Sequence, residues 1–548
     1  MQREIITLQL GEYANHVGAH WWNLQEAGFI YDPKQIALKE VENDILFRQG
    51  LTFRGEETYT PRLLLFDVRS SLRTLPEQGF LYKGDSSRGG VTWNGAIEKV
   101  ERDITSNNKE TSEGEDIAME VTDQERITGA CYIPSDTTIA SDVMSWSDYL
   151  VTQLHPRSVN LIPNEVEIGF PHSNSYCMGS LCLQNAEFSQ LIENQLHFFV
   201  EDCDNLQGFQ LLSGLSDGYG SLTSQLLSSL SDEYHKSGKC CIPFLPSLPL
   251  IDSFDTFSPH LTLALNLSDW LEHASMLTPL SNSQLPLPFL HHQSNSYHTA
   301  SVLAAAIDTA SLIYRIPESG LDMQDYTSIL TASGRKLTSL STLLPFPLLR
   351  ESTLLHSLSL HPLISAACLT PSVHASCTPI TACNIVRGIP PSYKLFGTGT
   401  SSYDSFTSPN DLISHEFGSK YSGCNSFSML ANSPLTLRYP FPNIFSSNIT
   451  HDGFITSHIS TDTVESRLAT NPVKSIPVST AIENHNGLFT LVNNCVELFQ
   501  NKTYLQLFSV AQKLELDTLQ ETRHSLLDVL DRYPVPEDLV LQSDTDSD

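Results

Sequence analysis

Apolar and polar residues in the first half of the chain follow a pattern typical of strands that turn through glycine into helices. In the clearest unit, the apolar run at 208–212 predicts a buried strand, and a turn rich in glycine and serine follows from Ser213 to Ser221. Leucines at positions 222, 226, 227 and 230 then recur at the spacing of one helix face. Such a turn presents backbone N–H groups and a helix N-terminus, which favour an anion. Here it carries the carboxylate of Asp217 instead.

The same reading gives elements along the rest of the chain. Strands are predicted at 4–10, 63–68 and 380–386, and helices at 13–27, 146–154, 186–200, 297–314, 480–499 and 516–533. Residues 397–475 have weak periodicity and predict long loops.

Strand–glycine–helix units predict an α/β fold, an open and mostly parallel sheet with helices on both faces. In that architecture a ligand binds beyond the carboxyl ends of the strands. The turns after Leu10, Asp67 and Leu212 are therefore expected to meet at one cleft.

The charge of the chain excludes several classes of partner. Its 62 acidic and 31 basic residues give a formal net charge of −31, and no basic cluster offsets it. Nucleic acid and anionic lipid are poor partners for such a chain, so a protein with a basic patch is the better expectation. The sequence shows no secretory signal and no membrane-spanning run, and its cysteines form no zinc-type or disulfide framework. We expect a reduced, cytoplasmic protein whose membrane association, where it occurs, is peripheral.

Several segments resemble tubulin. The N-terminal REIITLQLGEYANHVGAHWW is similar to the tubulin strand, loop and helix that meet the nucleotide, and CDNLQGFQL is similar to the segment before its glycine-rich signature loop. SYHTASVLAAAIDTA resembles the central tubulin helix. More specific pieces, namely VGAHWWNLQEAGF, LLLFDVRSSL, WSDYL followed by HPRS, and ASGRK, resemble the Misato family. Misato proteins are tubulin-related and are implicated in mitochondrial distribution and morphology.

The resemblance implies a division of the chain into tubulin-like parts. Residues 1–295 would form a nucleotide-binding-type domain with a Rossmann-like sheet, interrupted by a disordered acidic insertion at about 101–141. The central helix and its connecting loop would occupy 296–334, and a second α+β domain 335–475. C-terminal helices would follow at 476–535 and an acidic tail at 536–548.

The resemblance also places a phosphate site, and the chain departs from it. Of the signature loop, only Gly218, Gly220 and Ser221 persist, while Asp217 would face a phosphate and Tyr219 adds bulk. Two like charges in a partly dry cleft cost several kcal/mol. The simpler reading is a tight turn in which Asp217 caps the helix.

Two further loops complete the expected cleft. In the first loop Gly11 and Asn15 match tubulin, whereas Glu12 is an added carboxylate. After the second strand, Asp67 is followed by Arg69 where tubulin has the acid that helps to hold magnesium. We expect Arg69 to neutralise Asp217 or Glu12 internally, or else to meet a phosphate without magnesium.

For the base, Asn282 falls at a guanine-contacting position and Tyr297 where an aromatic ring stacks on guanine. The second guanine-contacting Asn appears here as Ser301. A tyrosine at the start of an apolar helix is more often an anchored core residue, so both readings stay open.

Tubulin hydrolysis depends on an acid that the loop after the central helix supplies to the next subunit. The best alignment puts Thr327 there, with Asp322 and Asp325 out of register, and a shift of the alignment by two residues would put Asp325 there instead. Because activating water needs a carboxylate at the right distance, we expect no tubulin-type GTPase enzyme, with weak residual activity as the alternative. No metal site and no cofactor are expected; a retained GTP or GDP is the alternative.

Three functions are open at this point. The first is a non-catalytic scaffold of the Misato type, a monomer or small oligomer that regulates mitochondrial distribution, morphology and fusion with protein partners at the outer membrane. The second is a divergent GTP-binding switch without efficient hydrolysis. The third is an assembly factor that acts with tubulin, the spindle or a cytosolic chaperonin.

Overall fold

The computed structural model describes most of the chain outside the acidic stretch. The described ranges are residues 3–29, 40–51, 57–73, 145–163, 175–281, 295–361, 366–373, 378–396, 406–421, 423–456 and 472–534, with residues 55, 75–76, 143, 166, 283 and 287–290 between them. The predicted insertion at about 101–141, the tail at 536–548 and the candidate base-contacting Asn282 lie outside the described residues.

A seven-stranded sheet forms the first half of the molecule, in the order β5-β4-β1-β6-β7-β8 with β9 beside β7. All neighbours in this sheet run parallel. Its strands are β1 (Glu4–Leu10), β4 (Leu63–Asp67), β5 (Val159–Leu161), β6 (Leu206–Gly214), β7 (Gly238–Leu245), β8 (Met276–Leu277) and β9 (Leu280–Ser281). The near-continuous apolar runs in these strands are typical of a parallel sheet buried on both faces. The predicted α/β class is confirmed.

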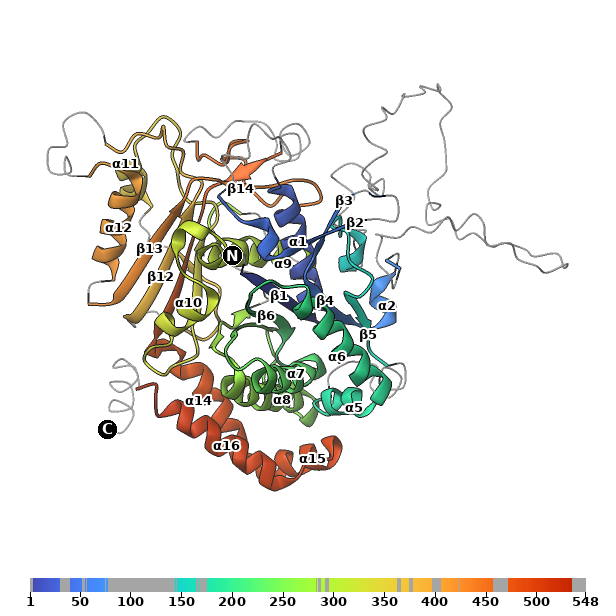
Figure 1. Ribbon diagram of the computed structural model, residues 1–548. Helices are drawn as coiled ribbons and strands as arrows, with labels where there is room; N and C mark the ends of the chain where they lie inside the picture. The colour runs from blue at the N-terminus through green and yellow to red at the C-terminus, as the bar shows by residue number, and fades with distance from the viewer. Residues whose placement is uncertain are drawn as a thin grey trace, which may run out of the picture.

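Helices cover both faces of this sheet (Figure 1). On one face lie α1 (Glu12–Ala27) and α9 (Ser296–Ala310), packed on Ile5, Leu63 and Leu65. On the other face Ile6, Leu64 and Phe66 pack against a second set of helices, because successive strand residues point to opposite sides. This second set is α5 (Met178–Gln184), α6 (Ala186–Glu201), α7 (Gly218–Glu233) and α8 (Phe254–His273).

A second, five-stranded sheet follows in the order β11-β10-β16-β12-β13. Its strands are β10 (Ser339–Leu343), β11 (Ala367–Cys368), β12 (Pro379–Arg387), β13 (Asn425–Ala431) and β16 (Val478–His485). The central helix α9 packs on one face, against Cys383 and Ile385, and α11 (Leu354–Leu360) and α12 (Pro409–Lys420) pack on the other. The central helix therefore lies between the two sheets.

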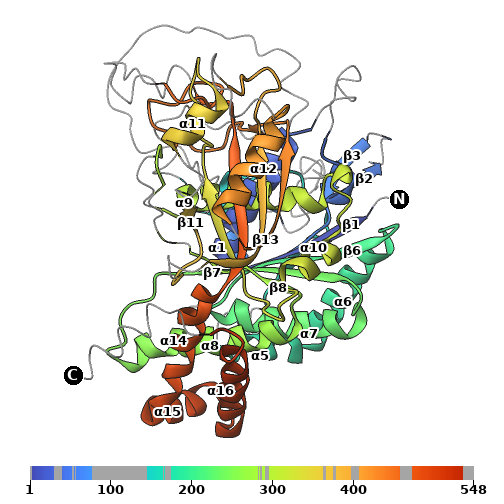
Figure 2. The same ribbon diagram turned by 90° about the vertical axis from the view of Figure 1, so that its left-hand side faces the viewer.

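Shorter elements link and close these layers. They are the 3₁₀ turns η2 (Asn43–Ile45), η4 (Trp146–Asp148), η5 (Ser311–Tyr314), η6 (Pro317–Ser319), η9 (Asn486–Leu488) and η10 (Leu498–Gln500), the helices α2 (Arg69–Leu72) and α10 (Met323–Leu330), and the strands β2 (Phe47–Leu51), β3 (Glu57–Pro61), β14 (Leu435–Thr436) and β15 (Ser475–Ile476). The C-terminal helices α14 (Phe489–Glu497), α15 (Lys502–Gln512) and α16 (Leu516–Leu530) pack beyond α8 (Figure 2).

Two sequence predictions are wrong in this half. The helix predicted at 480–499 begins as strand β16, a central strand that pairs with both β10 and β12, and becomes helical only at α14. The long loops predicted across 397–475 contain α12 and β13. Ser408 and Asp411 form a capping box at the start of α12, a local signal that the weak apolar periodicity concealed.

A buried ion network joins the central helix to both halves of the molecule. The carboxylate of Asp308 on α9 lies 2.9 Å from Arg315 and 2.6 Å from Arg387 of β12, and it also accepts a hydrogen bond from Gln25 of α1. Burial alone would raise the pKa of Asp308, but the two guanidinium groups hold it below its usual value. The network therefore fixes α1, α9 and the second sheet to one another.

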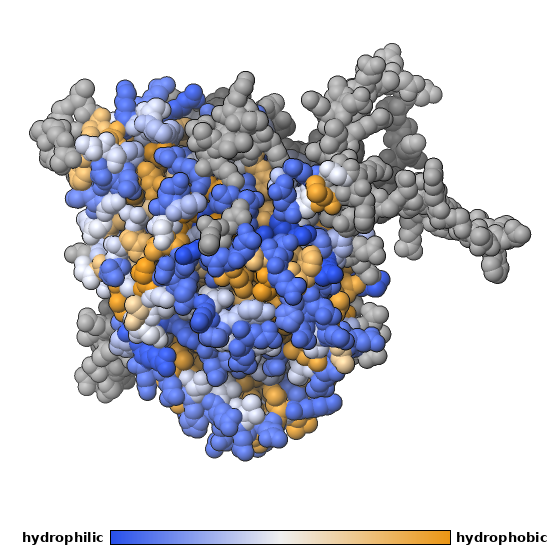
Figure 3. All heavy atoms as spheres, viewed as in Figure 1, coloured by the Kyte–Doolittle hydropathy of each residue, from blue (hydrophilic) through white to orange (hydrophobic). Residues whose placement is uncertain are grey.

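The face in Figure 3 is largely hydrophilic, with hydrophobic residues scattered across it. No helix among the described residues has the length and apolar character needed to cross a bilayer.

Replacement of Asp308 tests the network. We expect Asp308→Asn to lower the free energy of unfolding by about 3–5 kcal/mol, because it leaves two buried arginines without a counter-charge. Urea denaturation followed by circular dichroism measures this loss. Asp325→Asn, at an exposed position, is the matched control and should unfold like the wild type. Equal midpoints for both variants would contradict a structural role for the network.

Candidate functional site

The carboxylate of Asp67, at the end of β4, is the polar centre of the predicted cleft, and its side chain is fully buried. Its Oδ2 accepts hydrogen bonds from Asn15 Nδ2 and from the indole Nε1 of Trp146, each at 2.8 Å. Its Oδ1 accepts from the backbone N–H of Val68 at 2.8 Å and from the hydroxyl of Tyr219 at 3.3 Å. Burial raises the pKa of Asp67, although hydrogen bonds from Asn15, Val68 and Trp146 act in the opposite direction.

Asp217 caps the helix that follows the glycine-rich turn, as predicted. Its Oδ1 accepts the backbone N–H of Gly220 at 3.1 Å at the N-terminus of α7. Burial raises the pKa of Asp217 to about 6, while the backbone N–H groups of Gly220 and Tyr219 lower it. The positive end of this helix dipole therefore already has a carboxylate from the same chain.

Tyr219 fills the space between the first turn and α7. Gly11 has a φ of +93°, and a Cβ built on it would lie 2.8 Å from Cδ2 of the Tyr219 ring. Tyr219 is 4% exposed, and its ring packs directly on the Gly11 backbone. This is where the backbone would have to approach a phosphate, so side-chain packing replaces that contact.

The remaining residues of the signature loop are explained by packing. A Cβ on Gly218 would lie 2.7 Å from Met178, and one on Gly220 would lie 2.4 Å from Nδ2 of Asn266 on α8. The hydroxyl of Ser221 donates to the Gly218 carbonyl at 2.8 Å and accepts the N–H of Gly179 at 2.9 Å. These residues therefore seat α7 against α5 and α8.

Tyr297, at the predicted base-stacking position, lies within an aromatic cluster. Its ring centroid is 4.9 Å from that of Tyr149 and 5.0 Å from that of His20, and the His20 ring stacks on Tyr149 at 4.5 Å. The Tyr297 hydroxyl donates to the carbonyl of Pro440, and the residue is 5% exposed. Side chains of the same chain therefore occupy the contacts that a stacked base would need.

The other predicted base contact in the described part of the chain is also satisfied internally. Ser301 is fully buried, and its hydroxyl donates to the carbonyl of His298 one turn earlier at 2.7 Å. It therefore hydrogen-bonds within α9.

Trp146 and Tyr149 belong to one short segment, residues 145–150, which we call the plug segment. The predicted helix at 146–154 is wrong, since the helical part is only the 3₁₀ turn η4. A capping box between Ser145 and Asp148 forms this turn, and Asp148 pairs with Arg73 at 2.9 Å. The turn thereby positions the Trp146 indole against Asp67 and the Tyr149 ring against Tyr297. The WSDYL motif pointed to the Misato family, but its sequence did not predict that these residues pack into the cleft.

The two charged residues predicted beside the phosphate site lie near the surface. Glu12, the first residue of α1, is exposed, and partial burial together with the charge of Asp67 raises its pKa. Arg69 begins α2 and is exposed. Neutralisation of Asp217 or Glu12 by Arg69 stays a prediction.

The loop and helix expected to supply a catalytic acid carry none at the aligned position. Thr327 is 1% exposed, and its hydroxyl donates to the carbonyl of Gln324 on its own helix at 3.1 Å. Asp322 caps α10 by accepting the N–H of Asp325 at 2.7 Å, and it also pairs with Arg3. The side chain at the aligned position is thus buried, and only the out-of-register Asp325 is exposed.

Comparisons with known proteins show which family this fold belongs to. A family model for the Misato segment II tubulin-like domain matches residues 3–116, and a tubulin-domain model matches residues 135–316. Protein misato homolog 1 from Danio rerio is 30% identical over 530 residues, covering 88% of each chain. Protein misato from Drosophila melanogaster is 30% identical over 533 residues, covering 90% of this chain and 91% of the relative.

The chain belongs to the Misato family. Protein misato homolog 1 from Homo sapiens is also 30% identical, over 81% of this chain and 84% of the relative. The family assignment and the tubulin-like fold predicted from the sequence are confirmed.

The cleft of this Misato-family chain does not fit a magnesium–guanine nucleotide. Asp217 occupies the position expected to face a phosphate, and both Asp217 and the neighbouring Asp67 already accept hydrogen bonds from this chain. The Tyr219 ring covers Gly11, and Tyr149 covers Tyr297. Within the described ranges, no group of three His, Cys, Asp or Glu side chains is arranged to hold a metal ion.

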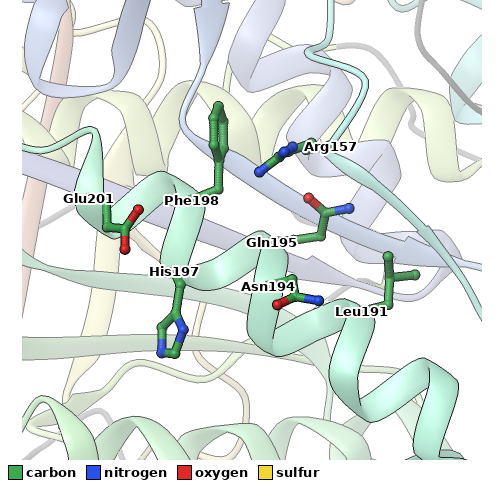
Figure 4. Close-up of a pocket in the computed structure, with 7 residues that line it drawn as sticks. All are labelled: Arg157, Leu191, Asn194, Gln195, His197, Phe198 and Glu201. Atoms are coloured by element: carbon green, nitrogen blue, oxygen red, sulfur yellow. The ribbon is translucent and has the colours of Figure 1, made fainter.

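A hollow of about 490 Å³ lies elsewhere on this Misato-family fold, on the outer face of α6 (Figure 4). Its lining includes Arg157, whose guanidinium stacks over the Phe198 ring at 4.2 Å. None of the residues predicted for a nucleotide site lines this hollow.

Burial of His20 in the aromatic cluster predicts how the stability of the protein depends on pH. Burial lowers the pKa of His20 to about 3, whereas an unfolded histidine titrates near about 6.5. Below that pH the unfolded chain takes up a proton that the folded chain does not, so stability falls as the pH falls. His20 therefore lowers the free energy of unfolding by about 2 kcal/mol when the pH falls from 7 to 5.

We expect His20→Phe to lose about 2 kcal/mol less than the wild type between those two pH values. Urea denaturation at each pH measures the difference. The replacement also removes the hydrogen bond to the Tyr297 carbonyl, so the change with pH, and not the stability itself, is the readout. His524→Phe, on the exposed face of α16, is the matched control for replacing a histidine by phenylalanine. The same slope in His20→Phe and wild type would argue against a buried neutral imidazole.

Proposed function

We propose that this Misato-family protein is a non-catalytic, tubulin-like scaffold that regulates mitochondrial distribution and morphology from the cytosolic face of the outer membrane. The observation that supports the absence of catalysis is the occupied cleft. Asp67 takes its hydrogen bonds from Asn15, Trp146 and Tyr219, and Asp217 takes its own from α7. The mitochondrial part of the proposal rests on the family resemblance.

Electrostatics and sterics act together against a nucleotide. A phosphate would have to displace a capping carboxylate and an aromatic ring, and a guanine would have to displace Tyr149 from Tyr297. Each displacement exposes a buried group or leaves a buried acceptor without its donor, which costs about 1–3 kcal/mol per group. We expect the sum of these costs to exceed the binding free energy that the altered loop could contribute through its remaining contacts with a phosphate.

Calorimetric titration of the nucleotide-stripped protein with GTP and GDP, with and without magnesium, tests this directly. We expect no binding heat at high micromolar nucleotide, with tubulin as the positive control. Asp217→Asn keeps the helix cap but removes the charge, and we expect it to bind no better because Tyr219 still covers Gly11. Tight guanine-specific binding by the wild type would overturn the proposal in favour of the GTP-binding switch.

A rescue experiment tests the cellular part. Cells depleted of the endogenous protein are expected to show altered mitochondrial networks that wild type and Asp325→Asn restore equally, because no exposed acid is needed for chemistry. Failure of Asp325→Asn alone would point to hydrolysis. Normal mitochondria together with recovery of tubulin or chaperonin subunits in a pull-down would favour the assembly factor.

A further inference from the structure

Strand β13 lies at the edge of the second sheet. It pairs in parallel with β12 alone, from Thr381 beside Asn425 to Arg387 beside Ala431. None of the other strands in the described ranges pairs with its outer side. In Figures 1 and 2 the strand runs along the outside of this sheet next to α12.

One hydrogen bond shows which backbone N–H and C=O groups of β13 point away from β12. The carbonyl of Ala431 accepts the N–H of Gly388, which follows β12, at 3.0 Å, so the backbone of Ala431 faces β12. Because backbone direction alternates along a strand, Ser426, Ser428 and Leu430 direct their N–H and C=O groups away from β12. Across the part of the chain that the structure describes, no hydrogen bond reaches these backbone groups.

The end of the same edge already binds an acceptor. The N–H of Asn432, the next outward residue, donates to Glu40 Oε1 at 2.9 Å, and that of Ser433 donates to Oε2 at 2.8 Å. A carboxylate from a distant part of the chain therefore satisfies this end, while the three outward residues before it have backbone groups available for pairing.

The strand also lacks the usual protection of an edge. Monomeric proteins guard exposed edge strands with charged residues, proline or bulges. The sequence of β13, NSFSMLA, contains no charged residue and no proline, and its ladder with β12 runs without a register shift. All seven of its residues are consecutive in the ladder, so an added strand would meet a regular edge.

We propose that the outer edge of β13 binds an extended, positively charged segment of a partner protein as an additional strand. Phe427 and Met429 are half-buried on one face, so the segment places apolar side chains beside them at every second position. On the other face Ser428 contacts Ser414 of α12, a helix on which two acids, Asp411 and Glu416, outnumber the single basic residue Lys420. Basic residues suit that face and the net charge of −31.

This inference does not rest on the proposed mitochondrial role. It adds a binding edge on the second sheet, remote in sequence from the occupied cleft, and it would hold for a protein that acts elsewhere. Failure of the rescue experiment therefore leaves it standing, and its own failure leaves the scaffold proposal standing.

A synthetic peptide tests the edge. The probe is a capped, fluorescent peptide of alternating lysine and valine, and the matched control is the same peptide with every backbone nitrogen methylated. Both carry the same side chains and charge, but the control cannot donate to β13. We expect the unmodified peptide to raise fluorescence anisotropy on binding, and the methylated one to bind at least about tenfold more weakly, the effect of losing one or two hydrogen bonds.

A variant of the protein gives a second readout. Ser426→Pro removes an outward N–H without removing a bond to β12, and edge strands tolerate proline at such positions. We expect it to fold normally by circular dichroism and to bind the peptide about tenfold more weakly. Ser426→Thr keeps the N–H and should bind like the wild type.

Three results would overturn the proposal. They are no binding of the unmodified peptide, equal binding of the methylated peptide, which would mean attraction by charge alone, and a concentration-dependent dimer that Ser426→Pro abolishes. The last result, measured by sedimentation, would assign the edge to a second copy of this chain.

Discussion

The buried carboxylate of Asp67 is the constraint on which the first half of the structure depends. A carboxylate taken out of water costs several kcal/mol unless the protein supplies hydrogen bonds in place of the solvent. Here Asn15 of α1, Trp146 of the plug segment and Tyr219 of α7 supply them. Each donor comes from a different element at the carboxyl ends of the strands, so solvating one charge draws these elements together. The raised pKa of Asp67 shows that burial still outweighs these bonds.

A second buried carboxylate, Asp308, plays the corresponding part between the two sheets, but with charged partners. Arg315 and Arg387 hold its pKa below the usual value, in contrast to Asp67. The contrast follows from the donors, because a guanidinium stabilises a carboxylate more strongly than an amide, an indole or a hydroxyl does. The central helix is thereby anchored at one end to the aromatic cluster around Tyr297 and near its other end to β12.

Local sequence patterns predicted the elements whose apolar residues recur at the spacing of a helix or a strand. They failed where pairing with a distant strand determines the structure. Strand β6 and the cap at Asp217 were both predicted, since an apolar run and a carboxylate before a helix are local signals. The sequence predicted a helix at strand β16 because its apolar positions fit the spacing of a helix as well as that of a strand. Pairing with β10 and β12 makes this segment a strand. The departures of the phosphate loop were visible in the sequence, but the filling of the cleft by Tyr149 depends on contacts across the fold.

An occupant that belongs to the chain has different consequences from a bound nucleotide. A ligand shifts a conformational equilibrium only through its concentration and its different affinity for the two states. The plug segment is covalently part of the molecule, so its concentration at the cleft cannot vary with the nucleotide pool. If the cleft is closed in this way, the tubulin fold is held in one state by its own side chains. In the proposed scaffold, a partner or a covalent modification at the surface would then be what changes the state of the molecule.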